Sequence, residues 1–154
     1  MTLHIGDVAP EFHMPGDLGE VSLAGLKGQA VVLYFYPKDD TTGCTNEAKG
    51  FTEHADAFEA AGAVVVGVSK DSVASHRKFR AKYGLAPMLG ADADGKVVEA
   101  YGVWVEKAMY GRKYMGVERA TFLIDKAGLV QKIWHKVKVP GHALEVLAAV
   151  QALA

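Results

Sequence analysis

The chain has 154 residues, half of them apolar, and a formal net charge of −1. This length is close to the usual size of one domain, so we expect residues 1–154 to form a single domain with a substantial core. A charge so near zero gives no reason to expect binding to nucleic acid or to a membrane surface. No apolar run approaches the ~20 residues that a transmembrane helix needs.

A few sequence features bear on the cellular compartment and on whether the protein binds a metal. Residues 1–16 lack the basic and apolar blocks of a signal peptide. Cys44 is the only cysteine, and a single unpaired cysteine fits a reducing compartment. We therefore expect a cytoplasmic protein. The six histidines are scattered, without the tight spacing of a zinc site, so we expect no metal.

The first half of the chain alternates strand and helix patterns. Residues 12–14 and 21–23 flank a Pro-Gly-Asp-Leu-Gly turn, which predicts an N-terminal β-hairpin. The β-branched and aromatic run at 31–36 predicts a buried strand that stops at Pro37. Apolar residues then recur at helical spacing, which predicts a helix over 45–61.

The second half continues the alternation. We expect a strand at 63–69 and a helix at 72–83, with Asp71 as its N-cap and Gly84 as its stop. The remaining expected elements are a weak strand at 87–89, a helical turn at 96–101, a hairpin of 120–125 with 129–137, and an amphipathic helix at 143–153.

Residues 103–118 show no clear period. Basic and aromatic residues interleave there, which would also suit contact with RNA or a partner protein. We interpret the stretch as a solvated loop that borders the functional site.

This order of elements predicts an α/β fold: a thioredoxin-like sandwich with a central mixed β-sheet flanked by helices and an N-terminal β-hairpin. In open α/β sheets, ligands bind at the carboxyl ends of the strands. Cys44 follows the strand at 31–36, so the sequence predicts a functional site around this residue.

Cys44 should lie in or just before the first turn of a helix. Unpaired backbone N–H groups and the positive end of the helix dipole favour an anion there, and they lower the pKa of a thiol. The alternative is a small buried hydrophobic residue, which most free cysteines are. The small polar neighbours Thr41, Thr42, Gly43 and Thr45 favour a reactive thiolate in a hydrogen-bonding pocket.

The motif PxxxTxxC, formed by Pro37, Thr41 and Cys44, resembles the active-site motif of the peroxiredoxins. The wider text YFYPKDDTTGCTNEA is similar to their bacterioferritin comigratory protein, or PrxQ, branch. The similarity continues through GVSKDS, ADADGKVVEAYGVW and ERATFLIDKAGLV, and it covers nearly the whole chain. It implies that the cysteine attacks a hydroperoxide, becomes a sulfenic acid, and releases water or an alcohol.

The resemblance also implies that a distant arginine, Arg119 by its place before TFLID, completes the catalytic site. Attack on an O–O bond needs a thiolate, donors that hold the peroxide, and positive charge near the leaving oxygen. Cys44, Thr41, Arg119 and the backbone N–H groups of Gly43 and Cys44 would supply them. Pro37 would shield the sulfur from water and fix the loop. No metal or organic cofactor is required.

Two residues have competing interpretations. Spacing alone would place Arg119 in a surface ion pair with Glu118 or Asp125, and only the resemblance places it in the site. Glu47, three residues after Cys44, either caps the helix or orients a nearby arginine. We do not count Glu47 among the catalytic residues.

The chain departs from the branch at the second, resolving cysteine. Many members have it five residues after the first or on a later helix. Here the nearer position is Lys49, and the chain has no second cysteine to form an intramolecular disulfide. The sulfenic acid must therefore be reduced by an external thiol. Thioredoxin, a glutaredoxin with glutathione, or a small thiol would each serve. Members of this branch are often monomeric, so by analogy we expect a monomer.

The sequence thus predicts a one-cysteine, thiol-dependent peroxidase that reduces hydrogen peroxide and organic hydroperoxides in antioxidant defence. One alternative is a redox sensor or regulatory protein that uses the same cysteine once and passes the oxidation to a partner. Another is an interaction domain in which Cys44 is inert. Recycling by a generic thiol distinguishes the first from the second.

Overall fold

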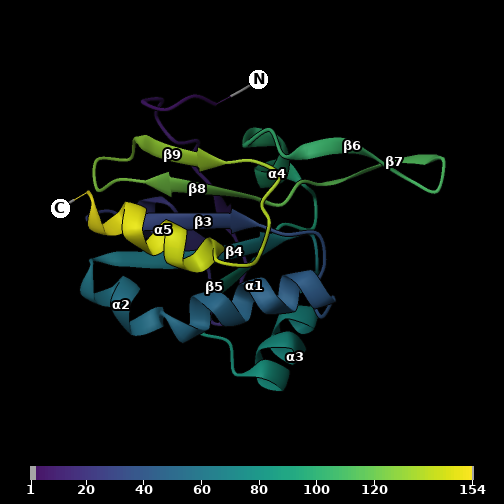
Figure 1. Ribbon diagram of the computed structural model, residues 1–154, viewed down its shortest axis with the longest axis horizontal. Coiled ribbons are helices and arrows are strands. Elements are labelled where there is room, and N and C mark those ends of the chain that lie inside the picture. Colours follow the sequence, from purple (N-terminus) through teal and green to yellow (C-terminus); the bar gives the residue numbers. More distant parts are fainter. Residues whose placement is uncertain (1–2, 154) are drawn as a thin grey trace.

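The computed structural model describes residues 3–153, and within them a mixed sheet of five strands lies at the centre, in the order β5-β4-β3-β8-β9 (Figure 1). Separate two-stranded sheets are formed by β1 with β2 and by β6 with β7. The strands are His13–Met14 (β1), Val21–Ser22 (β2), Ala30–Phe35 (β3), Ala63–Ser69 (β4), Met88–Ala91 (β5), Trp104–Met109 (β6), Arg112–Val117 (β7), Ala120–Ile124 (β8) and Val130–Trp134 (β9). The helices are Ala24–Leu26 (η1), Thr42–Glu53 (α1), Ala55–Ala60 (α2), Val73–Tyr83 (α3), Lys96–Ala100 (α4) and His142–Gln151 (α5).

Strand β3 is the middle of the sheet, parallel to β4 and antiparallel to β8. All six of its residues are buried, as expected of an apolar run covered on both faces. Val31, Leu33 and Phe35 belong to one core cluster, and Val32 and Tyr34 belong to the other. The alternation places one cluster on each face of the sheet.

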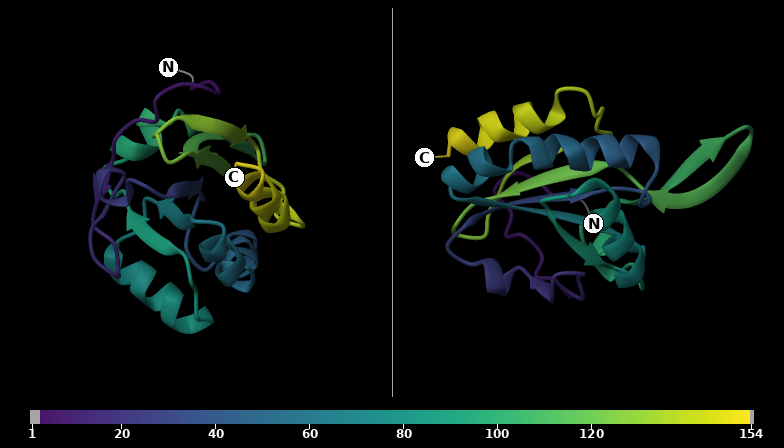
Figure 2. Two further views of the ribbon diagram at one scale, coloured as in Figure 1. Left: turned by 90° about the vertical axis from the view of Figure 1, so that its left-hand side faces the viewer. Right: turned by 90° about the horizontal axis from the view of Figure 1, so that it is seen from below.

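Different elements cover the two faces (Figure 2). Side chains of α1, α2, α3 and α5 pack on one face, where Phe51, Phe58, Phe79 and Val146 join the cluster. The N-terminal hairpin, η1 and α4 cover the other face. The expected thioredoxin-like architecture, with its central mixed sheet and N-terminal hairpin, is therefore confirmed.

The single helix expected over 45–61 is two helices in the structure, α1 and α2. It begins earlier, at Thr42, and is interrupted at His54, after which α2 follows. Shortly before the interruption, the Thr52 hydroxyl donates to the Ala48 carbonyl at 2.7 Å. Such bonding from Thr to the preceding turn bends helices.

The N-cap of α3 is Ser72 rather than the expected Asp71, because the Ser72 hydroxyl accepts a hydrogen bond from the Ser75 N–H at 3.1 Å. Asp71 instead accepts from the backbone N–H of Asp39. Gly84 ends the helix in the left-handed conformation with φ 63°, as expected.

The interpretation of residues 103–118 as a loop was wrong. They form the antiparallel hairpin β6-β7, which extends beyond the body of the molecule (Figures 1 and 2). Its turn is made by Tyr110 and Gly111, with φ 52° and 75°, the two positive values of a type I′ turn. Both faces of the hairpin are largely exposed, so the period-two alternation that reveals a half-buried strand is missing.

Among residues 3–153, no helix is both long and apolar enough to cross a membrane.

Candidate active site

Cys44 lies in the first turn of α1, just beyond the carboxyl end of β3. Thr41 precedes the helix with extended backbone, and its carbonyl accepts the first helical bond, from the Thr45 N–H at 2.8 Å. The N–H groups of Thr42, Gly43 and Cys44 therefore lie in the turn that has no helical acceptors. They and the helix dipole favour a negative sulfur.

The cysteine side chain is 1% exposed and packs in the same core cluster as Tyr34 and Phe51. Burial alone would suit the inert, hydrophobic alternative. The charged group beside the sulfur argues against that alternative. Arg119 donates from Nη2 to Cys44 Sγ at 3.4 Å, and a partly buried guanidinium is a partner for a thiolate, not for an inert apolar group.

Arg119 comes from the short link between β7 and β8, where its carbonyl accepts a hydrogen bond from the Val137 N–H at 2.9 Å. Gly43 allows the guanidinium to approach the first turn of α1. A Cβ at Gly43 would lie only 3.0 Å from Arg119 Nη2. The structure thus brings Cys44, Gly43 and Arg119 together.

The second terminal nitrogen of the guanidinium, Nη1, is hydrogen-bonded to Glu47. Arg119 Nη1 donates to Glu47 Oε1 at 2.7 Å, and the two side chains are 18% and 1% exposed. The interpretation of Glu47 as a residue that orients an arginine is therefore favoured over the helix cap. The alternative ion pairs of Arg119 are wrong, because Glu118 pairs with His135 and Asp125 accepts from Ala127 and Leu129.

Burial dominates the electrostatics of Glu47. It raises the pKa of this carboxyl to about 7, although the Arg119 charge and hydrogen bond act in the opposite direction. Burial lowers the pKa of Arg119, but the charges of Glu47 and Cys44 outweigh that effect and the net shift is upward. Arg119 therefore stays charged between two acidic groups.

Thr41 and Pro37 lie in the loop between β3 and α1, and both are exposed. The hydrogen bond of the Thr41 hydroxyl is made within the loop rather than to the sulfur. The hydroxyl donates to the Lys38 carbonyl at 2.9 Å, which leaves the oxygen lone pairs to accept from a ligand. Pro37 directly follows the buried Tyr36, where the backbone leaves the sheet.

A buried polar network that the sequence analysis missed holds this loop against α3. Asp39 accepts from the Tyr36 hydroxyl, the Ser75 hydroxyl and His76 Nδ1, each at 2.7 Å. Its backbone N–H donates to Asp71 at 2.8 Å. These hydrogen bonds hold the loop that leads to Cys44 against α3.

His76 is the centre of that network and is fully buried. Its Nδ1 faces Asp39 and its Nε2 faces the Gly90 carbonyl at 2.9 Å. Both partners are acceptors, so the ring is an imidazolium. Burial lowers the pKa of His76, but Asp39 and the Gly90 carbonyl outweigh it and raise the pKa overall. The signal available in the sequence was the spacing of His76 and Phe79, which are three residues apart and therefore lie on the same face of the helix.

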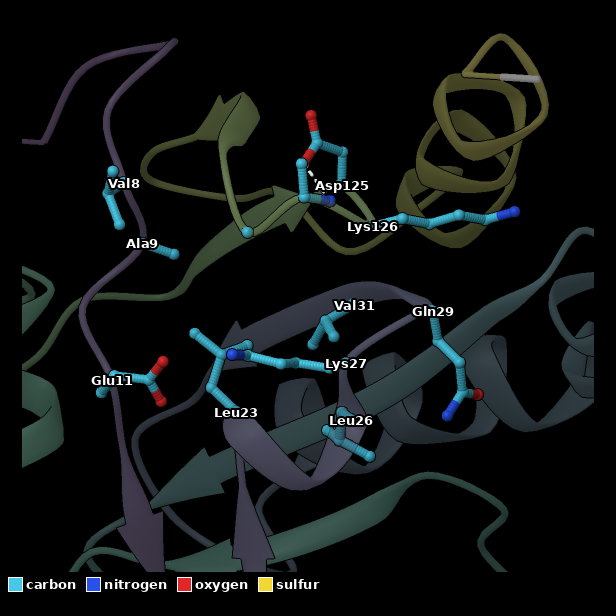
Figure 3. Close-up of a pocket in the computed structure, with 12 residues that line it drawn as sticks. Val8, Ala9, Glu11, Leu23, Leu26, Lys27, Gln29, Val31, Asp125 and Lys126 are labelled. Atoms are coloured by element: carbon cyan, nitrogen blue, oxygen red, sulfur yellow. Dashed lines mark hydrogen bonds between the residues drawn. The ribbon is translucent and has the colours of Figure 1, made fainter.

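The pocket in Figure 3 is separate from this site. Gln29 and Val31, at the amino end of β3, line it together with the turn at Asp125 and Lys126. Cys44 follows the opposite, carboxyl end of β3. Across residues 3–153, no three His, Cys, Asp or Glu side chains are grouped as a metal ion would need.

Comparison with known proteins agrees with the geometry. The model of the AhpC/TSA family matches residues 5–133. The chain belongs to the AhpC/TSA family. Within this family it is similar to a putative peroxiredoxin bcp from Coxiella burnetii, with 52% identity over 96% of this chain and 98% of that one. Peroxiredoxin Bcp from Bacillus subtilis is 49% identical, over 96% of this chain and 94% of that one.

The fold is also similar to solved structures. A mutant of PrxQ from Xylella fastidiosa superimposes with a TM-score of 0.91 at 39% identity, over 99% of this chain and 98% of that one. The bacterioferritin comigratory protein of Xanthomonas campestris, studied for alkyl peroxide reduction, gives a TM-score of 0.89 at 42% identity, over 98% and 97%. The predicted resemblance to the Bcp, or PrxQ, branch is confirmed, and this member has Cys44 alone, without a resolving cysteine.

Proposed function

We propose that this chain is a thiol-dependent peroxidase that reduces hydrogen peroxide and organic hydroperoxides through a sulfenic acid on Cys44. The observation that carries the proposal is the 3.4 Å contact of Arg119 Nη2 with Cys44 Sγ at the first turn of α1. The contact puts a fixed positive charge beside the sulfur, where a thiolate forms and where the leaving oxygen becomes negative.

In the peroxide step, the Cys44 thiolate attacks the terminal oxygen of the hydroperoxide. An S–O bond forms as the O–O bond breaks, so the sulfur is oxidised to a sulfenic acid and the peroxide is reduced. The other oxygen leaves as hydroxide or alkoxide and takes a proton to become water or an alcohol. The Arg119 fork interacts with the sulfur and the departing oxygen at the same time.

The remaining site residues have supporting roles in this proposal. The Thr41 hydroxyl already donates to Lys38, so its oxygen accepts the O–H of the incoming peroxide. The backbone N–H groups of Gly43 and Cys44 stabilise negative charge at the reacting oxygens. Pro37 fixes the loop before Thr41 and limits the access of water. Together they make Cys44, Thr41, Arg119 and Pro37 the proposed catalytic set.

Recycling of Cys44 needs two external thiols, because the chain has no other cysteine. The first thiol condenses with the sulfenic acid to a mixed disulfide and water, and the second releases the Cys44 thiol as an external disulfide forms. Since Cys44 is 1% exposed, the first turn of α1 must open before a protein thiol reaches the sulfur. Thioredoxin, glutaredoxin with glutathione, and a small thiol are the candidate reductants.

We also propose a cytoplasmic, monomeric protein in which residues 1–154 form one domain. The reducing compartment is supported by the single unpaired cysteine. The single domain is supported by a chain length typical of one domain and by the two core clusters that share β3.

Stopped-flow consumption of one equivalent of hydrogen peroxide by the reduced protein tests the function. We expect rapid addition of one oxygen to Cys44, measured by mass, followed by turnover when thioredoxin or glutathione is supplied. Cys44→Ser should consume no peroxide. Oxidation without recycling by any thiol would point to the redox sensor, and oxidation no faster than that of a free thiol would refute the peroxidase.

A further inference from the structure

Arg119 is shared by two acidic groups that are almost completely buried. Its Nη2 contacts Cys44 Sγ at 3.4 Å, and its Nη1 contacts Glu47 Oε1 at 2.7 Å. If both acids were ionised, the three side chains would carry a net buried charge of −1. If one of them keeps its proton, the cluster is neutral. Burial strongly favours the neutral cluster, because an uncompensated buried charge is costly.

The geometry of Glu47 indicates which acid keeps the proton. Only Oε1 meets Arg119, while Oε2 is buried and has no hydrogen-bond partner within the described residues. A carboxylate with a bare buried oxygen lacks much of its solvation. The sulfur, in contrast, lies at the first turn of a helix, where the N–H groups and the dipole favour its anion. The proton is therefore better placed on Glu47.

Resting on the proposed peroxidase function, we propose that Glu47 is a positioning residue that holds a proton while Cys44 is a thiolate and gives it up when Cys44 becomes a sulfenic acid. The cluster of Cys44, Glu47 and Arg119 then stays neutral through the whole peroxide step. Before the step, the thiolate balances Arg119. After the step, the Glu47 carboxylate balances it.

The atoms and charges of this step balance without a proton from solvent. The thiolate takes the terminal OH of the peroxide, the O–O bond breaks, and the leaving hydroxide or alkoxide needs one proton. Glu47 loses one proton as the negative charge on sulfur disappears. In sum, thiolate, protonated Glu47 and hydroperoxide become sulfenic acid, Glu47 carboxylate and water or alcohol.

The titration of Glu47 supports this cycle. Burial raises its pKa to about 7, against the lowering effect of the Arg119 charge and hydrogen bond. A carboxyl group with this pKa can both hold and release a proton near neutral pH.

Three other titratable groups lie around the cluster, and two of them, Tyr34 and His142, stay neutral during the step. Burial raises the pKa of Tyr34 on β3 far above its ordinary value and lowers that of His142 on α5 to about 4, so both are neutral. Burial and the Arg119 charge lower the pKa of Lys107 on β6. The charges of Cys44 and Glu118 act in the opposite direction and raise it, and the side chain is partly exposed.

Counting protons tests the proposal. The reduced protein is mixed with one equivalent of hydrogen peroxide in weakly buffered solution just above pH 7, with an indicator dye and a mass measurement of Cys44. We expect a thiolate absorbance in the resting protein, with Cys44→Ser as its blank, and almost no proton uptake per sulfenic acid. The infrared carbonyl band of a protonated carboxyl group should disappear on oxidation.

Glu47→Gln is the informative variant, because the amide keeps an oxygen for Arg119 Nη1 but has no proton to release. It should take up about one proton per sulfenic acid and lack the infrared change. Glu53→Gln, at the exposed carboxyl end of α1, is the matched control and should behave like the unmodified protein.

Three results with the unmodified protein alone would overturn the proposal, so the test stands even if Glu47→Gln fails to fold. They are uptake of one proton per sulfenic acid, an unchanged carboxyl band on oxidation, and a resting thiol without thiolate absorbance. Equal uptake by Glu47→Gln and the unmodified protein would do the same. If the mass shows no oxygen on Cys44, the peroxidase function itself fails, which separates the two failures.

Discussion

Arg119 Nη2 lies 3.4 Å from Cys44 Sγ, although 75 positions separate the two residues in the chain. The contact joins the first turn of α1, which follows β3, to the link between β7 and β8, so it depends on the pairing of β3 with β8. It turns a buried cysteine, which by itself would be unremarkable in a core, into a charged site. The chemistry of the chain follows from this contact more than from any other.

Arg119→Ala should slow sulfenic acid formation by about 10²-fold or more, because it removes the charge that stabilises the thiolate and the leaving oxygen. Arg119→Lys should recover only part of the rate, since a point charge cannot contact both groups as the fork does. Arg112→Ala, on the exposed hairpin, is the control. Stopped-flow oxidation measures all three, and an unchanged rate in Arg119→Ala would remove this residue from the site.

Gly43→Ala should lower the oxidation rate while the protein stays folded. The new methyl group would lie 3.0 Å from Arg119 Nη2 and push the guanidinium away from the sulfur. The stability of the helix should not suffer, since Ala is favoured over Gly in helices by about 1 kcal/mol. Gly50→Ala on the same helix would meet only Ala143, at 3.4 Å. Equal rates in the two variants would contradict the close approach.

His76 makes stability depend on pH. Its pKa is raised in the folded state, so its contribution is fully present below the pKa of an unfolded histidine and is lost as the pH rises through the folded-state value. His76→Asn should cost about 3–5 kcal/mol at low pH, because it leaves Asp39 buried without its cation. Urea unfolding across pH measures this cost, which should shrink at alkaline pH. A cost that is constant with pH would show that the ring is neutral.

The turn of the β6-β7 hairpin offers a test of backbone strain away from the site. Tyr110 has φ 52° and is 97% exposed, and left-handed backbone costs a residue other than glycine about 1–2 kcal/mol. Tyr110→Gly should therefore raise stability or leave it unchanged. Gly111→Ala, at φ 75°, should lower it by about 1 kcal/mol. Thermal unfolding compares the two, and a stabilised Gly111→Ala would refute this turn.

The sheet and the location of the thiol could be predicted because their signals are local. The buried run of β3 and the helical spacing after Cys44 are each readable within about ten residues of chain. Arg119 was different, because spacing suggested an ion pair with a neighbour and only the family resemblance placed it beside the sulfur. A contact between distant segments leaves no trace in the local pattern.

The other features that the sequence did not predict were also missed for physical reasons. The partners of Glu47 and Asp39 come from other elements, so the local sequence shows charged residues without showing that they are buried. The β6-β7 hairpin is exposed on both faces, and its strands therefore lack the alternation that marks a strand in sequence. Its Tyr110-Gly111 turn also lacks the Asn-Gly or Asp-Gly pair that most strongly signals a hairpin.

The most direct test of the account is the rate at which reduced protein consumes one equivalent of hydrogen peroxide, compared with Arg119→Ala and Cys44→Ser. The account predicts rapid formation of a sulfenic acid on Cys44, slowed by about 10²-fold or more without Arg119 and absent without Cys44. Oxidation of the unmodified protein at the rate of a free thiol, or equally fast with and without Arg119, would contradict it.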